Sequence, residues 1–325
     1  MDQILNLAAS NLLSPIILSF VLGVGAALAR SDLSVPEAAA KTMSIYLLFA
    51  IGFKGGVAVA DHGVDLTLGF SLLAGVVLSF FLPLVAFGLL NVMTDLSRLD
   101  AAAVAAHYGS ISIVTFVAAT SILEQAGLTA EGYMVAVAAA MEAPAILSAL
   151  WLISRGGDGR RMDNELMREI MFNGSIVLLV GAFLIGGITG ADGLARIESF
   201  IVSPFQGVLC LFLLDMGLVA GRGLRQGGEV LRPGVLAFGV LMPLVGSVFG
   251  LGAGMLLGLS TGGVMLMMVL SASASYIAVP AAMRVALPEA NPSIYLTLSL
   301  GVTFPFNLTL GLPLYLAVAQ ALTGG

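Results

Sequence analysis

The segment SASASYIAVPAAMR, residues Ser271–Arg284, follows directly on the apolar run GGVMLMMVL. Three serines occupy every second position at its start, and Pro280 follows them. Serine side chains compete for backbone hydrogen bonds, and a proline removes one helical hydrogen bond and crowds the preceding turn. The segment therefore predicts a break in an otherwise hydrophobic helix.

The composition around this segment is typical of a membrane protein. Of the 325 residues, 59% are hydrophobic and only 10% are charged, and the mean hydropathy is +1.06. Apolar runs of about 20 residues, long enough to cross roughly 30 Å of hydrocarbon, recur along the chain. We expect an all-α polytopic membrane protein, with the first run retained as a helix. A net charge of −6 gives no indication of a nucleic-acid partner, and the single cysteine excludes an intrachain disulfide.

Polar clusters, glycines and prolines divide the chain into ten predicted spans. Of the 13 basic residues, all but Lys54 and Arg196 fall in or beside the connectors after spans 1, 3, 5, 7 and 9. The positive-inside rule places these connectors in the cytoplasm and both termini outside. The spans are expected near residues 12–29, 37–59, 67–91, 101–122, 132–153, 173–190, 200–221, 234–257, 263–283 and 293–321.

The two halves of the chain also resemble each other. FLPLVAFGLL (Phe81–Leu90) aligns with LMPLVGSVFG (Leu241–Gly250) at a shift of 160, and SISIVTF (Ser110–Phe116) aligns with SASASYI (Ser271–Ile277) at 161. Each half has five spans, an odd number, so the second must enter the membrane upside down. The sequence predicts two inverted five-helix repeats, residues 1–153 and 173–325, joined by a cytoplasmic connector, 154–172. Spans 4 and 9 are expected to be interrupted helices.

The two matching serine-rich segments are a candidate substrate site. Inverted-repeat transporters bind ligands at interrupted helices, where half-helix N-termini attract anions and unwound carbonyls and hydroxyls coordinate cations. The alternative is close helix packing, with each serine bonded to its own helix. The candidate anion-binding residues are Ser110, Ser112, Thr115, Ser271, Ser273 and Ser275.

A carboxylate in the middle of span 5 is the candidate cation site. A charged side chain at this depth is expensive unless it is paired, protonated or bound to a cation. Glu142 lies two residues before Pro144, and the corresponding region of the second repeat contains Thr303 and Asn307. We expect these three residues to bind sodium, whereas the neutral oxygens would not suit a tight divalent site. A structural hydrogen bond from Glu142 to a neighbouring helix is the alternative.

Other ionisable residues leave further interpretations open. Lys54 and Asp215 differ in depth by roughly 16 Å, so we expect Lys54 to extend to the outer interface instead of pairing with Asp215. His107 near Ser110 raises the possibility of an intramembrane hydrolase, although no nucleophile elbow, HExxH or paired-aspartate motif accompanies it. A passive anion channel and a membrane sensor or scaffold are the remaining alternatives.

The C-terminal region, from SASASYIAVP to the end, resembles the sodium-dependent bicarbonate transporters of cyanobacteria. In the first half, GSISIVTFVAATSILEQ resembles the family through Ser112, Thr115 and Glu124, and MEAPA places Glu142 at the family's acidic position. The matching C-terminal residues are Ser273, Ser275, Ile277, Pro280, Arg284, Asn291, Pro292 and Ser293.

This resemblance implies sodium-coupled uptake of bicarbonate in a bacterial inner membrane, with the substrate held between two broken helices. It also implies a homotrimer and a cytoplasmic PII-like regulator. The sequence departs from the family pattern at Tyr276, which replaces an aspartate, and at Ile113-Val114 and Ala278-Val279, which replace polar or small residues. These departures favour a different small anion, such as a carboxylate. The connector 154–172 is shorter than the family's.

Overall fold

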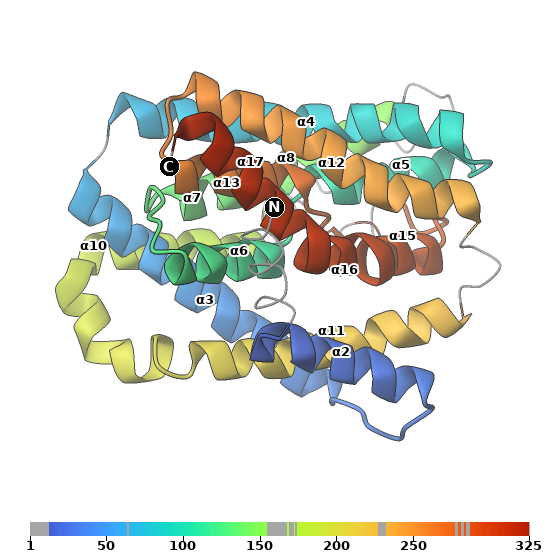
Figure 1. The fold of residues 1–325 in the computed structure, drawn as a ribbon, viewed down its shortest axis with the longest axis horizontal. Coiled ribbons are helices and arrows are strands. Elements are labelled where there is room, and N and C mark those ends of the chain that lie inside the picture. The colour runs from blue at the N-terminus through green and yellow to red at the C-terminus, as the bar shows by residue number, and fades with distance from the viewer. Residues whose placement is uncertain are drawn as a thin grey trace.

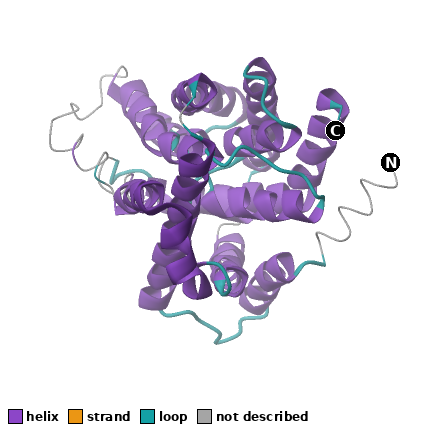
Figure 2. Ribbon diagram, turned by 90° about the vertical axis from the view of Figure 1, so that its left-hand side faces the viewer, coloured by secondary structure: helices purple, strands orange, loops and turns teal. Residues whose placement is uncertain are grey.

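The computed structural model describes residues 13–63, 65–154, 168, 172, 174–226, 232–276, 279–280, 283 and 287–324. Within these ranges every regular element is a helix, as Figures 1 and 2 show. The helices of the first half are α2 (Pro15–Leu28), α3 (Glu37–His62), α4 (Leu66–Met93), α5 (Arg98–Gly109), α6 (Ile113–Gln125), α7 (Met134–Ala140) and α8 (Glu142–Ser154). The second half contains α10 (Gly174–Ile201), α11 (Phe205–Gln226), α12 (Pro233–Leu256), α13 (Thr261–Ala272), α15 (Pro292–Leu298), α16 (Phe304–Phe306) and α17 (Leu312–Thr323).

The helices confirm the all-α membrane class but not the full count of ten spans. In the described stretches of the chain, eight helical segments are long and apolar enough to cross a membrane. Two shorter apolar helices, α2 with 14 residues and α13 with 12, occupy the places of the expected spans 1 and 9. Neither reaches the roughly 20 residues that a bilayer requires. The break that follows α13 is the physical reason for its shortness.

Span 6 extends beyond its expected end at residue 190. Helix α10 runs on to Ile201, with a kink at Gly190. Gly190 has φ of 60° and ψ of −156°, a conformation that only glycine adopts without strain. Gly190, at the expected end of span 6, therefore forms a bend between two helical segments of α10.

The helices pack in two groups, which Figure 1 shows as a lower and an upper layer. In one group α2 lies along α11 and α3 lies along α10. In the other group α5 and α8 pack on α4, and α13 packs on α12, with α4 and α12 in contact. Each group therefore combines helices from both halves of the sequence.

Glycines allow the backbones of the first group to approach closely. A Cβ on Gly23 of α2 would collide with the carbonyl of Leu214 on α11, and a Cβ on Gly217 would collide with that of Phe20. In the absence of a hydrophobic drive between helices in lipid, such close packing is a main source of association. The α2–α11 pair is thus a tightly packed unit.

Each broken helix lies against a helix that contains a proline. Pro83 is inside α4 and Pro243 is inside α12, at the equivalent positions of the two repeated segments. Gly109, the last residue of α5, leaves no room for a Cβ beside Pro83. Gly246 of α12 similarly contacts the carbonyl of Ser271. These contacts fix the two chain segments on which the candidate site lies.

The expected connector 154–172 falls largely outside the described residues, which include only Ser154, Arg168 and Phe172 of it. Its location on the cytoplasmic side of the membrane stays a prediction.

Candidate functional site

The first serine-rich segment is a helix break, as expected. Helix α5 ends at Gly109, Ser110 and Ser112 have extended backbones, and α6 begins at Ile113. Ser112 is the N-cap of α6, and its Oγ accepts hydrogen bonds from the Thr115 N–H at 3.2 Å and the Thr115 hydroxyl at 2.9 Å. The break thus ends with a serine that caps the following half-helix.

The second serine-rich segment breaks the chain in the same way. Helix α13 ends at Ala272, and Ser273 is extended, with φ of −89° and ψ of 163°. The Ser273 hydroxyl donates to the Leu270 carbonyl at 3.1 Å, and the Asn307 side chain donates to the Ala272 carbonyl at 2.9 Å. Both carbonyls are near the end of a helix, where backbone oxygens lack partners in the next turn.

Two hydrogen bonds join the breaks to each other. The Ser112 N–H donates to Ser273 Oγ at 3.0 Å, and the Ser275 N–H donates to the His107 carbonyl at 2.8 Å. Ser112 and Ser273 are equivalent residues under the shift of 161. The structure therefore brings the two predicted segments into direct contact. We call the place where Ser112 meets Ser273 and His107 meets Ser275 the crossing. All six predicted anion-binding residues are buried, with at most 3% of any of them exposed.

Several hydroxyl protons at this crossing have no acceptor among the described residues. Ser112 Oγ accepts two hydrogen bonds and Ser275 Oγ accepts one from the Val279 N–H, but no described group accepts either proton. Ser271 Oγ and Tyr276 Oη make no hydrogen bond at all within the same described ranges. Buried polar groups are normally satisfied, so a cluster of free donors indicates a ligand with acceptor oxygens.

The N-terminus of α6 adds backbone donors to the same place. The N–H groups of Ile113 and Val114 lie in the first helical turn, where no intrahelical acceptor is available. Such groups and the helix dipole favour negative charge. The described residues of the two breaks contain no lysine or arginine, so the donors are all neutral.

Glu142 lies beside the first break. It is the first residue of α8 and is 5% exposed, and the Ser110 hydroxyl donates to its Oε2 at 2.8 Å. The neighbouring Met141 carbonyl accepts a hydrogen bond from Ser79 of α4 at 2.6 Å, which anchors the start of α8. No described lysine or arginine pairs with the carboxylate. The structure thus places a single buried carboxylate next to a helix break.

Thr303 and Asn307 lie in two π-helical segments, η1 (Ser299–Thr303) and η2 (Asn307–Gly311), on either side of α16. Thr303 Oγ1 accepts from the Tyr108 hydroxyl at 2.6 Å and donates to the Gly239 carbonyl at 2.7 Å. Asn307 Oδ1 accepts from the Tyr315 hydroxyl at 3.0 Å. Within the described residues, no hydrogen bond links either side chain to Glu142.

The three predicted sodium-binding residues therefore belong to three hydrogen-bonded sets. Two of these sets are neighbours, because Tyr108, which bonds to Thr303, is only two residues before Ser110, which bonds to Glu142. Sequence reasoning missed Tyr108 as a partner of Thr303. No local pattern signals it, because the two residues are 195 positions apart.

His107 takes part in the crossing through its backbone carbonyl, which accepts the hydrogen bond from the Ser275 N–H. Its buried ring bonds through Nδ1 to the Ala103 carbonyl at 2.7 Å and stacks on Tyr295, with 4.6 Å between ring centroids. Among the described residues, no hydrogen bond joins this ring to a serine or a carboxylate. The histidine is therefore not arranged as the base of a hydrolase.

Lys54 lies at one end of α11 and not beside Asp215. Its Nζ is 5.8 Å from the centroid of the Phe205 ring, at the first residue of α11. Asp215 is ten residues farther along this helix, or about 15 Å. The expected separation of Lys54 and Asp215 is confirmed.

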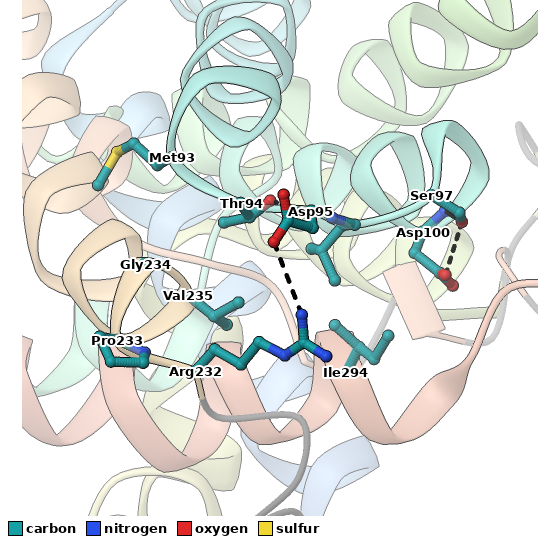
Figure 3. A pocket seen from close by; sticks show the side chains of 11 residues that line it. Met93, Thr94, Asp95, Ser97, Asp100, Arg232, Pro233, Gly234, Val235 and Ile294 are labelled. Atoms are coloured by element: carbon teal, nitrogen blue, oxygen red, sulfur yellow. Dashed lines mark hydrogen bonds and ion pairs between the residues drawn. The ribbon is translucent and has the colours of Figure 1, made fainter.

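A hollow of about 470 Å³ opens at the other end of α5, between residues 93–100 and 232–235 (Figure 3). Its charged groups already have partners. Arg232 Nη1 is 3.6 Å from Asp95 Oδ2, and Asp100 accepts from the Ser97 hydroxyl at 2.6 Å and the Asn291 N–H at 2.8 Å. The breaks are therefore the stronger candidate for a ligand site.

The apolar helices, the two joined helix breaks and the buried donors define a polytopic membrane protein with an internal polar site. Residues 15–320 match the Na+-dependent bicarbonate transporter superfamily, and the chain belongs to this family. Its members are transporters and not enzymes. A comparison with individual curated proteins gave no match.

Proposed function

We propose that the protein is a sodium-coupled symporter of bicarbonate or a similar small anion, which it binds where the two helix breaks meet. The 3.0 Å hydrogen bond between the Ser112 N–H and Ser273 Oγ carries the proposal, because it brings the two serine-rich segments together inside the protein. The family match supports sodium and bicarbonate as the ligands.

The free donors support an anionic substrate. An anion at the crossing would accept hydrogen bonds from the hydroxyls of Ser112, Ser271 and Ser275 and lie near the first N–H groups of α6. Ser110, Thr115 and Ser273 already donate to protein atoms, so we assign them to holding the breaks in shape. Neutral donors of this kind bind a small anion without trapping it in a strong ion pair.

Glu142 is the proposed centre of the sodium site. A carboxylate beside an anion would repel it unless a cation lies between them. The Ser110 side chain bonds to Glu142, and the last carbonyls of α5, at Tyr108 and Gly109, lie on the same segment. Carbonyls at half-helix C-termini are common sodium ligands in transporters with broken helices.

Thr303 and Asn307 are proposed to contribute further oxygen ligands to the sodium site. Thr303 Oγ1 accepts from Tyr108 and so fixes the segment that leads to Ser110, while Asn307 holds the end of α13. Either oxygen retains one lone pair for sodium after these bonds.

We further propose that the fold is an inverted repeat of ten spans, with residues 1–153 and 173–325 as its halves. The packing supports the symmetry, because α2 on α11 is the counterpart of α3 on α10, and α5 on α4 is the counterpart of α13 on α12. The distribution of basic residues supports cytoplasmic connectors, with both termini outside a bacterial inner membrane.

Transport would move the two helix groups relative to each other. Each group contains helices from both halves, so the moving bodies are the packing groups and not the sequence halves. A homotrimer and a PII-like regulator are further predictions that rest on the family resemblance.

Uptake into proteoliposomes tests the proposed function. We expect radiolabelled bicarbonate to accumulate when sodium is placed outside and potassium inside, and to equilibrate without accumulation when the sodium gradient is absent. Uptake that is indifferent to sodium would contradict symport and favour a passive channel.

A further inference from the structure

Tyr276 is the largest polar side chain at the crossing, and its hydroxyl has no hydrogen-bond partner among the described residues. The residue is 7% exposed and directly follows Ser275, whose N–H is tied to the His107 carbonyl. The phenol lies close to the Ser112 side chain. Two hydroxyl groups whose protons have no acceptor among the described residues therefore lie close together.

The Tyr276 ring is held in place by an aromatic chain. It packs edge-on against Phe304, with 5.2 Å between centroids, and Phe304 packs edge-on against Phe20 of α2 at 5.1 Å. These contacts fix the ring and so the position of its hydroxyl. A donor that is already immobilised loses little entropy when a ligand binds.

A structural role for this hydroxyl has little support. Burying a hydroxyl without a partner is unfavourable, and replacement by an apolar group of the same shape is neutral or stabilising. Two other buried tyrosines show the usual arrangement, since Tyr108 bonds to Thr303 and Tyr315 bonds to Asn307. The exception at Tyr276 points to a ligand.

We propose that the Tyr276 hydroxyl donates a hydrogen bond to the transported anion and favours anions that carry a carboxylate-type group. This inference rests on the proposed function. Hydrogen bonds to ionised acceptors are the strong ones, and they strengthen with the basicity of the acceptor oxygen. Bicarbonate and short monocarboxylates are more basic than nitrate.

The test is the Tyr276→Phe variant, which removes one oxygen atom and retains the ring against Phe304. We expect the dissociation constants of bicarbonate and formate to rise on the order of ten- to a hundredfold at saturating sodium. The constant for nitrate should rise by a smaller factor. The sodium dissociation constant measured without anion should not change, and the unliganded variant should unfold at the same temperature as the wild type or a higher one.

Tyr46→Phe is the matched control. The Tyr46 hydroxyl donates to the Phe200 carbonyl at 2.7 Å, in the α3–α10 pair and away from the breaks. This variant loses the same atom but should keep the wild-type affinities.

Unchanged bicarbonate affinity in Tyr276→Phe, or an equal loss for nitrate, would overturn the inference while the proposed function stands. A lower unfolding temperature with unchanged affinities would show that the hydroxyl is structural. If the wild-type protein binds none of the three anions, the proposed function itself fails.

Discussion

Replacement of Glu142 by glutamine separates its proposed role in sodium binding from a structural one. The side chain is 5% exposed and accepts a hydrogen bond from the Ser110 hydroxyl at 2.8 Å. Glutamine has nearly the same shape and retains an oxygen that can accept this hydrogen bond. The substitution therefore removes the negative charge with little change in packing.

The magnitude follows from the loss of one charge next to the ion. Two unit charges 4 Å apart in an effective dielectric of 20 attract by about 4 kcal/mol. Dehydration of the ion and the carboxylate offsets part of this attraction. We expect Glu142→Gln to weaken sodium binding by about 2–3 kcal/mol, which corresponds to a dissociation constant about 30- to 160-fold higher.

Thermal unfolding in sodium and in potassium measures this change. At a sodium concentration of 100 times the dissociation constant, the ion stabilises the wild type by about 2.7 kcal/mol, and a hundredfold weaker variant gains only about 0.4 kcal/mol. In potassium alone, Glu142→Gln should be as stable as the wild type or more stable, because it no longer buries an unpaired charge.

Glu131→Gln is the matched control for this experiment. The Glu131 carboxylate accepts from the Ser260 N–H at 2.6 Å, at the N-terminal end of α13 and far along that helix from its break. It should retain the wild-type response to sodium. If Glu142→Gln also retains that response, Glu142 is structural and the sodium site must be sought among the backbone carbonyls of the two breaks.

Two other sets of variants test the crossing and the helix packing. Ser112→Ala and Ser273→Ala should each weaken anion binding by about 1 kcal/mol or more, as measured by equilibrium binding. Each substitution removes a hydroxyl that takes part in the hydrogen bonds of the crossing. Unaltered affinity in both would favour the packing interpretation of the serines. Gly217→Ala should destabilise the α2–α11 pair by about 1–3 kcal/mol in thermal unfolding, because its Cβ would collide with the Phe20 carbonyl. Gly25→Ala is the control, since a Cβ at Gly25 meets no other atom, and it should be close to neutral.

The two helix breaks are predictable from the sequence because their cause is local. Alternating serines offer competing hydrogen bonds, and the repeat shift of 161 identifies Ser112 and Ser273 as equivalent residues without any knowledge of their contact. Their direct hydrogen bond is the packing consequence of that equivalence. Hydropathy likewise identifies the apolar helices, although α13 is shorter than a full span because its break falls early.

The partners of the candidate cation residues could not be predicted from local patterns. Thr303 and Asn307 were expected to join Glu142, but they bond to Tyr108 and Tyr315. The π-helical segments that contain them lie on either side of Pro305, which has no N–H to donate to the regular helical ladder. Gly190 shows that a local pattern can also be misread. A glycine at the expected end of a helix can instead allow a kink, after which the helix continues.

Linked binding of the two ligands tests the central claim most directly. If sodium at Glu142 offsets the repulsion between this carboxylate and the anion, sodium should raise the affinity for bicarbonate. Bicarbonate should then raise the affinity for sodium by the same factor. Calorimetric titration of purified protein in lipid nanodiscs, with each ligand added in the absence and in the presence of the other, gives both factors. The account predicts two equal factors of at least about ten, and two ligands that bind independently would contradict it.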